Sequence, residues 1–368
     1  MHISIAERLR PFCHEPGTST ILPGWGYQVQ VFPCLIRLYQ MNKSPPLLLT
    51  ELNLDFKGPV EQFTICNDLE KGRITIWGKT AEGWMRYHLM SALRYEGIRL
   101  LVERAPLNGF PIAEEGKCHL LHPGQWLDLL EQRSSFEPYL VPPCDRLSLG
   151  NHQAQDWEMI KRRFNLKELL PLVHRLGQLL PALPLTSSQE GTLALLEDCH
   201  QSFSSKRPEQ SEEKWKHFFL GCLSSLLVPQ LEDVHYQGLV KIQPLTSLEI
   251  SPLVILSEGS RLIRELFVQQ EKDDLAILPH LLPSLPCGRL LNVPLADGGL
   301  LSLEWTKKTI RRLILHVGGE DREFILKFHS SVRHYRLRQN DKEKGERKSC
   351  RSSLILKKNC RYLLDNFQ

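Results

Sequence analysis

The chain has 368 residues, of which 42% are hydrophobic and 24% are charged, and its formal net charge is only +4. This composition is ordinary for a soluble globular protein, and at roughly 100–200 residues per domain the length predicts two or three domains. The small net charge argues against a surface that is basic throughout, and no apolar run approaches the ~20 residues that a membrane-spanning helix needs.

The N-terminal residues and the cysteines bear on location. The first segment, MHISIAERLRPF, interrupts its apolar residues with Glu7, Arg8 and Arg10, so it lacks the continuous apolar region of a secretory signal. The ten cysteines are scattered and none forms a C-x-x-C pair, which disfavours both a zinc site and a disulfide framework. We therefore expect free thiols, a cytoplasmic location, no metal site and no cofactor.

Residues 1–105 are predicted to form an antiparallel β-sandwich. Short alternating or apolar runs recur from residue 18 onward, and turns that contain glycine, such as Lys57-Gly58-Pro59 and Ala81-Glu82-Gly83, separate them. Short strands at regular spacing are typical of a sandwich. The predicted strands are 27–39, 47–56, 63–66, 74–77, 84–89 and 100–103.

Trp77 and Trp84 flank one of these turns. Two tryptophans on neighbouring strands can form a platform for a sugar ring, so both are candidate carbohydrate-binding residues. The commoner alternative is a cross-strand aromatic pair that only stabilises the sheet.

Residues 106–150 are rich in proline and glycine and are predicted to be a connector with one short helix at 125–133. Residues 151–270 are predicted to be helical, because apolar residues recur at i, i+3 and i+4, most regularly over 166–180. Residues 202–213 are expected to be a flexible loop. Ser251-Pro252 is expected to begin a further helix, since serine is favoured at the N-cap and proline at the next position.

Residues 271–338 are predicted to form a second antiparallel β-sandwich, so the fold class is α+β with a sandwich at each end. Leu301, Leu303 and Trp305 alternate along one strand, and we expect Trp305 to fill the core. Residues 339–368 are predicted to be a basic tail, since 336–361 holds ten Lys or Arg against three Asp or Glu. Such a tail can bind nucleic acid, but a solvated terminus is the favoured interpretation.

Two segments of the chain resemble the β-sandwich domains of glycoside hydrolase family 95. The first is 51–103, where Asp68-Leu69-Glu70-Lys71-Gly72 is similar to a turn of the family and Gly83–Tyr87 to the strand after it. The second is 259–317, and its matching residues are Leu278-Pro279, Leu285-Pro286, Gly288, Gly298-Gly299 and Glu304-Trp305. One departure is Leu295-Ala296-Asp297, where the family usually has arginine-rich sequence.

The resemblance implies an (α/α)6 barrel between the two sandwiches, and in the family this barrel holds the catalytic carboxylate and carboxamide groups. A dozen helices of about 11 residues with their loops need well over ~200 residues. Only residues 150–270 are available here. The resemblance therefore implies a reduced helical remnant of the barrel, and no catalytic residue is carried over.

The best replacements for the missing groups lie in the run NHQAQDWE. Asp156 and Glu158 are candidate acid and base residues, His152 shares a helix face with Asp156 if the helix begins early enough, and Trp157 is a candidate sugar-stacking residue. The alternative is that Asp156 caps a helix and Glu158 interacts with the helix dipole. Glu258 and Glu304 are expected to be ordinary surface or strand residues, and no nucleotide-binding, nucleophile-elbow or zincin motif is present.

Two functions remain open. The first is a non-catalytic relative of glycoside hydrolases that is retained for binding carbohydrate or another protein, and the second is a diverged glycosidase that uses the region 151–158. A pocket that contains two carboxylates, about 6.5–9.5 Å apart for an inverting enzyme, favours the second function.

Overall fold

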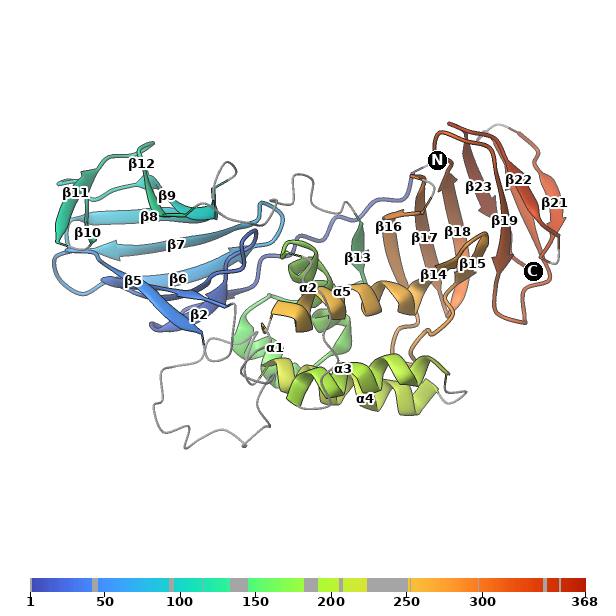
Figure 1. The fold of residues 1–368 in the computed structure, drawn as a ribbon, viewed down its shortest axis with the longest axis horizontal. Coiled ribbons are helices and arrows are strands. Elements are labelled where there is room, and N and C mark those ends of the chain that lie inside the picture. Colours follow the sequence, from blue (N-terminus) through green and yellow to red (C-terminus); the bar gives the residue numbers. More distant parts are fainter. Residues whose placement is uncertain are drawn as a thin grey trace.

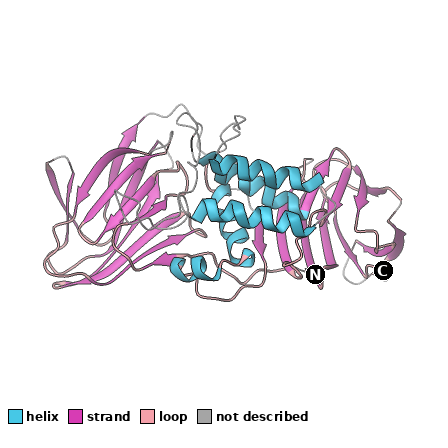
Figure 2. Cartoon of the chain, turned by 90° about the horizontal axis from the view of Figure 1, so that it is seen from below, coloured by secondary structure: helices cyan, strands magenta, loops and turns pink. Residues whose placement is uncertain are grey.

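The computed structural model describes residues 2–41, 46–92, 96–114, 116–132, 145–181, 191–204, 208–223, 251, 253–296, 298–339, 343–350 and 352–368. Antiparallel sheets lie at both ends of the molecule and a short helical region lies between them, which confirms the predicted fold class (Figure 1). Figure 2 shows the same order from below, with the helices packed between the two groups of strands.

The N-terminal sandwich consists of two six-stranded sheets, and all of its strand pairs are antiparallel. The first sheet has the order β1 (Phe12–Cys13), β6 (Glu61–Asp68), β7 (Arg73–Thr80), β8 (Gly83–Ser91), β9 (Glu96–Arg104) and β12 (Trp126–Gln132). The second has the order β11 (Lys117–Leu121), β10 (Phe110–Glu114), β5 (Leu47–Asn53), β4 (Leu35–Gln40), β3 (Gln28–Phe32) and β2 (Thr18–Ile21). Alternate residues of both sheets, such as Ile74, Ile76 and Leu89, point inward and form a core of their own.

Two expectations for this part need correction. The run 27–39 is not one strand but the hairpin β3–β4, with Phe32 paired to Leu35 across a turn at Pro33-Cys34. The helix expected at 125–133 is wrong, because residues 126–132 form strand β12, which pairs with β9. The apolar spacing of WLDLLEQ suits a helix or a strand, and long-range pairing with β9 decides between them. The proline- and glycine-rich turns within 106–132 therefore connect strands β10, β11 and β12 of the N-terminal sandwich.

The helical region contains five α-helices within the described ranges. They are α1 (Trp157–Arg163), α2 (Leu166–Gln178), α3 (Gly191–Gln201), α4 (Pro208–Cys222) and α5 (Leu253–Phe267), with a short 3-10 turn at Ser202–Ser204. Since α4 begins at Pro208, the expected flexible loop 202–213 is wrong in its second half. Helices α2 and α5 cross closely, because a Cβ atom on Gly177 would lie 2.1 Å from the carbonyl oxygen of Leu256.

The C-terminal domain pairs a seven-stranded sheet with a four-stranded one. The first has the order β13 (Arg146–Ser148), β16 (Gly288–Pro294), β17 (Leu300–Thr306), β18 (Thr309–His316), β23 (Arg361–Asp365), β20 (His334–Arg338) and β21 (Glu346–Ser349). The second has the order β14 (Val268–Glu271), β15 (Asp274–Ile277), β19 (Arg322–Lys327) and β22 (Leu354–Leu356). The pair β15–β19 is parallel, and the other pairs are antiparallel.

The segment 339–368 is more ordered than a solvated terminus. It supplies β21, β22 and β23, and β23 lies inside the larger sheet between β18 and β20. Asp365 at the end of β23 forms ion pairs with Arg336 and Arg338, so part of the positive charge of this region is neutralised within the sheet.

The N-terminal strap, residues 2–13, connects both ends of the molecule (Figure 1). Ile3 packs on the C-terminal sheet against Leu291, Ile314 and Leu363. At its other end the strap becomes β1, which pairs with β6 of the N-terminal sandwich. The helices and the C-terminal sheets share one continuous core, whereas the N-terminal sandwich has a separate one.

Trp305 is 1% exposed, which confirms that it fills the core of the C-terminal domain. Its indole nitrogen donates to the carbonyl oxygen of Leu285, and the ring packs 5.1 Å from that of Phe267. Gly288 leaves space for it, because a Cβ atom there would lie 2.3 Å from the indole.

We predict that Trp305→Ala lowers the free energy of unfolding by about 3–5 kcal/mol, since it leaves a large cavity in a buried core. Chemical denaturation measures the change. Trp84→Ala is the matched control, because Trp84 is 38% exposed and its removal opens no cavity. Equal losses of unfolding free energy in the two variants would contradict the role of Trp305 as a core residue.

Candidate functional site

Asp156 and Glu158 lie at the start of helix α1. Asp156 is the N-cap, and its Oδ1 accepts from the backbone N–H groups of Glu158 at 2.8 Å and Met159 at 3.2 Å. Glu158 lies in the first turn, where a negative charge interacts favourably with the helix dipole. Since α1 begins at Trp157, His152 lies outside the helix and does not share a helix face with Asp156. The geometry therefore accounts for both carboxylates as helix-stabilising groups.

Trp157 is 6% exposed and belongs to the core shared by the helices and the C-terminal sheets. An indole in this position has no free face on which a sugar ring can stack. Glu258 forms an ion pair with Arg261 one turn along α5, at 2.8 Å, which fits the expectation of a surface residue.

Trp77 and Trp84 lie on the same outward face of the first sheet of the N-terminal sandwich. In the β7–β8 register Trp77 is opposite Arg86 and Trp84 is opposite Lys79, so the two tryptophans are diagonal neighbours. Such neighbours are about 7–8 Å apart, a distance that large aromatic rings can bridge. Ile74 and Ile76, which alternate with Trp77 on β7, are buried on the inner face.

Trp126 also belongs to this outward face. It is opposite Leu101 on β9, and Leu101 is opposite His88 on β8. His88 is in turn opposite Thr75, which lies two residues before Trp77 on β7 and therefore on the same face of the sheet. At 56% exposed, Trp126 is the most exposed of the three tryptophans. It was missed in the sequence because the segment around it was expected to be helical. We call Trp77, Trp84 and Trp126 together the tryptophan face.

Polar side chains lie between these tryptophans. The guanidinium of Arg86 lies over the ring of Trp77 at 5.8 Å, and that of Arg99 lies over Trp126 at 5.1 Å. Both contacts are within the range of cation–π attraction. Arg99 also forms a bidentate ion pair with Asp128. The face thus combines flat apolar rings with hydrogen-bonding groups in fixed positions.

Buried His88 and exposed Glu103 continue this polar row. Nε2 of His88 lies 2.6 Å from Glu103 Oε2, and Nδ1 lies 3.0 Å from the hydroxyl of Thr75. Burial lowers the pKa of His88, the charge of Arg73 lowers it further, and Glu103 opposes them only in part. A neutral ring then donates from Nε2 to the carboxylate and accepts from Thr75.

The most buried polar cluster lies between the helices and β13. Asp145 is fully buried just before β13, and its carboxylate accepts from His174 at 3.2 Å, Gln178 at 2.6 Å and Arg264 at 2.9 Å. Burial alone would raise the pKa of Asp145, but the hydrogen bond and charge of His174, together with Arg264, lower it to about 2. The cluster thus holds a permanent charge in the interior.

Ser260 completes this cluster but does not make it a catalytic triad. Its hydroxyl lies 3.2 Å from Nδ1 of His174, yet it donates to the backbone oxygen of His174 at 2.8 Å. Ser260, His174 and Asp145 are all buried, so no substrate reaches the hydroxyl. The cluster is a structural link between α2, α5 and β13.

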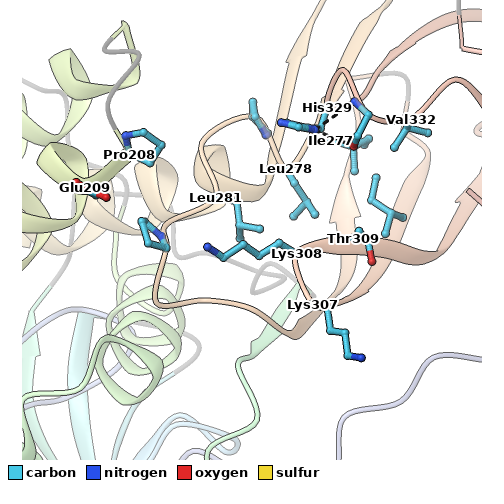
Figure 3. Close-up of a pocket in the computed structure, with 14 residues that line it drawn as sticks. Pro208, Glu209, Ile277, Leu278, Leu281, Lys307, Lys308, Thr309, His329 and Val332 are labelled. Atoms are coloured by element: carbon cyan, nitrogen blue, oxygen red, sulfur yellow. Dashed lines mark hydrogen bonds between the residues drawn. The ribbon is translucent and has the colours of Figure 1, made fainter. Parts of the chain in front are cut away.

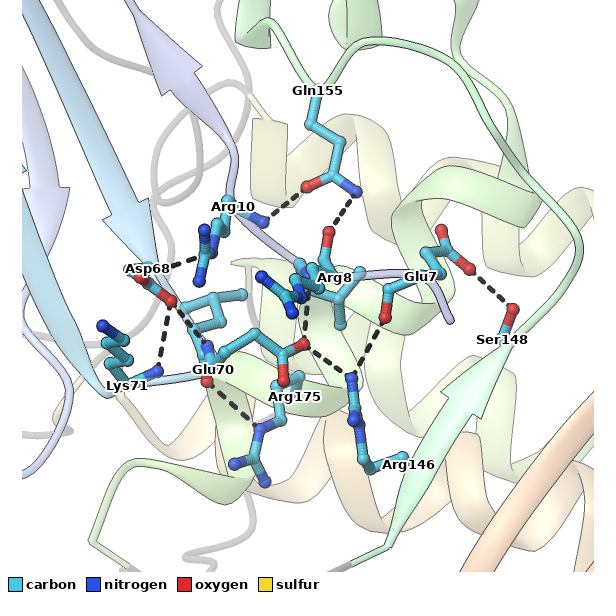
Figure 4. Close-up of polar contacts among 12 residues, drawn as sticks. Glu7, Arg8, Arg10, Asp68, Glu70, Lys71, Arg146, Ser148, Gln155 and Arg175 are labelled. Carbon is cyan, nitrogen blue, oxygen red and sulfur yellow. Dashed lines mark hydrogen bonds and ion pairs between the residues drawn. The ribbon is translucent and has the colours of Figure 1, made fainter. Parts of the chain in front are cut away.

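A second polar network holds the N-terminal strap (Figure 4). Arg146 donates to the backbone oxygen of Glu7 at 3.1 Å and to the side chain of Glu70 at 2.7 Å. Ser148 donates to the carboxylate of Glu7 at 2.6 Å. The side chain of Gln155 binds the strap backbone on both sides of Leu9. The strap is therefore fixed through its main chain, as a strand is.

A cavity of about 210 Å³ lies where the strap meets the C-terminal sheet, and Glu7, His152 and Glu304 line it. Burial raises the pKa of Glu7. Burial alone would also raise the pKa of Glu304, but hydrogen bonds from Arg312 and Arg289 outweigh it and lower that pKa. Two carboxylates whose pKa values are displaced in opposite directions are typical of an acid and base pair.

A larger cavity, of about 600 Å³, lies at the end of the β17–β18 hairpin (Figure 3). Helix α4, strand β15 and the 278–283 and 329–332 loops form its other walls. Its lining is mainly apolar, and Lys307 and Lys308 form the tip of the hairpin. Neither cavity is lined by Asp156 or Glu158.

Lys307 and Lys308 have left-handed backbone conformations, with φ of 53° and 61°. Asn and Gly are the favoured residues in such a two-residue turn, since in other residues the Cβ atom crowds a carbonyl oxygen there at a cost of about 1–2 kcal/mol per residue. The backbone N–H of Lys308 donates to the carbonyl oxygen of Pro286 at 2.8 Å, which ties the turn to the segment before β16.

Within the described ranges, no group of three or more His, Cys, Asp or Glu side chains is placed to hold a metal ion. The helices in the same ranges include none that is both long and apolar enough to cross a membrane. The described cysteines, nine of the ten, are free thiols. No protein-family model matches the chain, and no curated protein is significantly similar to it.

We predict that the Asp145 cluster makes the protein sensitive to acid. Because the folded-state pKa lies below its usual range, the ionised carboxylate stabilises the fold above about pH 4, and this contribution, on the order of 2 kcal/mol, is lost as pH falls toward 2. Denaturant titrations between pH 5 and pH 2 measure the loss.

The variant Asp145→Asn should lose about 3–5 kcal/mol at neutral pH, because it leaves the charge of Arg264 uncompensated at a largely buried site. It should also show a flatter acid profile than the wild type. Asp128→Asn is the control, since it removes a more exposed ion pair and should cost no more than about 1 kcal/mol. If stability falls with pH in Asp145→Asn as it does in the wild type, the Asp145 carboxylate is not the source of the acid sensitivity.

Proposed function

We propose that this protein is a non-catalytic binding protein that binds carbohydrate on the tryptophan face of its N-terminal sandwich. The proposal includes descent from glycoside hydrolases of the family 95 type, with the helices α1–α5 as the remnant of the barrel. The observation that carries the binding function is the position of three tryptophans on one outward face of a sheet.

The chemistry of the face suits a sugar. A pyranose ring presents apolar C–H groups on its faces and hydroxyl groups around its edge, so it needs a flat apolar surface with donors and acceptors beside it. Trp84 and Trp126 supply exposed rings. Arg86 and Glu103 supply charged hydrogen-bonding groups between them, and their mutual ion pair at 3.3 Å keeps both in place.

The rigidity of the face also supports binding. All three tryptophans project from hydrogen-bonded strands of one sheet, so their backbone positions are fixed before a ligand arrives. A preorganised surface loses less conformational entropy on binding than a loop does.

We predict that a glycan-array screen detects binding by the wild type, and that the double variant Trp84→Ala/Trp126→Ala weakens it at least tenfold. Leu120→Ala is the matched control, because Leu120 is 55% exposed and lies on β11 of the opposite sheet. Thermal unfolding checks that the variants remain folded. The proposal is contradicted if the double variant binds as the wild type does, or if the wild type binds no glycan on the array.

A diverged glycosidase is the second candidate function, and the cavity shared by Glu7 and Glu304 favours it. In that case Glu7, with its raised pKa, is the acid, and Glu304, with its lowered pKa, is the base. His152 is the member of the region 151–158 that reaches this cavity. Against this function, both oxygens of Glu304 already accept from Arg289 and Arg312, and about 210 Å³ lies below the usual 300–1,000 Å³ of a ligand site.

We therefore predict no hydrolysis of aryl-glycosides above background between pH 4 and pH 8. The control for this measurement is the double variant Glu7→Gln/Glu304→Gln, which removes both groups and should give the same rate. Hydrolysis by the wild type that disappears in the double variant would replace our proposal with the glycosidase.

A further inference from the structure

The larger cavity of the C-terminal domain has a lining that differs from the tryptophan face. Ile277, Leu278, Leu281 and Ile310 form an apolar wall, and prolines extend it toward α4. Of the lining residues that the structure describes, none is a tryptophan, tyrosine or phenylalanine. A sugar ring would therefore find apolar branched side chains instead of a flat aromatic surface.

The charge at this cavity is positive. Lys307 and Lys308 are exposed, and among the described residues that line the cavity the only carboxylate is that of Glu209, which is also exposed. Neither lysine forms an ion pair within the described part of the chain. In Figure 3 the side chain of Lys308 extends along the cavity beside Leu281, whereas that of Lys307 points away from it.

The strained turn at the hairpin tip gives a second, independent reason to assign a role to Lys308. The left-handed conformation at this position is favourable for glycine or asparagine, yet lysine occupies it. The hydrogen bond from its backbone to Pro286 fixes the backbone of this cavity-lining residue. Backbone strain of this kind is typical of positions where a side chain has to be presented in one direction.

We propose that this cavity binds a small organic anion with an apolar body, such as an aliphatic carboxylate. The apolar chain lies against Leu278, Leu281 and Ile310, and the carboxylate pairs with the ammonium group of Lys308. A volume of about 600 Å³ falls within the usual 300–1,000 Å³ of small-molecule sites, which are mostly apolar with a few charged or polar groups. This site is separate from the tryptophan face and does not depend on carbohydrate binding.

The experiment is isothermal titration calorimetry of the full chain with decanoate and, in parallel, with decan-1-ol. The two probes have the same apolar chain and differ in the charge of the head group. We expect decanoate to bind at least tenfold more tightly than decan-1-ol at low salt, and its affinity to fall as sodium chloride is added, because exposed charges are screened.

Lys308→Gln tests the assigned residue, since it leaves a polar side chain that is only one atom shorter and removes the charge. We expect it to weaken decanoate at least tenfold and to leave decan-1-ol unchanged. Lys358→Gln is the matched control, because Lys358 also follows a lysine and is exposed in a turn of the same domain. The control should bind both probes as the wild type does.

Leu281→Trp tests the cavity itself, since a large ring at this half-buried position fills it. We expect it to abolish binding of decanoate while the thermal unfolding temperature stays within a few degrees of the wild type. Absence of decanoate binding by the wild type overturns the proposal. Equal affinity for the alcohol, or unchanged affinity in Lys308→Gln, does so as well.

Discussion

The arrangement of the helices on the C-terminal domain depends on one buried charge. The carboxylate of Asp145 is out of contact with water, and a charge in that position is stable only when partners around it replace its hydration. The partners come from two helices: His174 and Gln178 from α2 and Arg264 from α5. A hydrophobic contact tolerates sliding, but these hydrogen bonds have fixed directions. They therefore set how α2 and α5 lie against β13.

The close crossing of α2 and α5 helps to fix the same arrangement of the helices around Asp145. Gly177 brings the two backbones together one position before Gln178, so the glycine and the glutamine act on the same turn of α2. Strand β13 follows Asp145 directly and carries Arg146, which binds the N-terminal strap. The positions of the helices, the strap and the edge of the C-terminal sheet are thus linked through two consecutive residues, Asp145 and Arg146.

The sequence predicts the fold class well, because local patterns determine it. Alternation and glycine turns predict both sandwiches, and the alternation around Trp305 predicts its burial. The helix expected at 125–133 fails because its apolar spacing fits a strand equally well, and pairing with a strand more than twenty residues away decides the outcome. Trp126 was missed for the same reason.

The candidate sites are harder to predict, because distant parts of the chain form them. Asp145 stands in a segment rich in proline, about 120 residues before its partner Arg264, and no local signal marks either residue. The cavity beside Lys308 combines α4, β15, a hairpin tip and a loop near residue 330. By contrast, Asp156 followed two residues later by Glu158 is a recognisable helix start, and the structure places both residues in that role.

The inner position of β23 has a consequence for the edges of the larger C-terminal sheet. Strands β20 and β21 form a hairpin whose contact with the rest of the larger sheet runs through β23. Without residues 361–365 in the sheet, β18 would present an unpaired edge with Leu313 and Leu315, and the hairpin would lose its neighbouring strand. Open strand edges are the usual starting point for association between copies of a chain. A change that keeps residues 361–365 out of the sheet would therefore expose this edge to other copies of the chain.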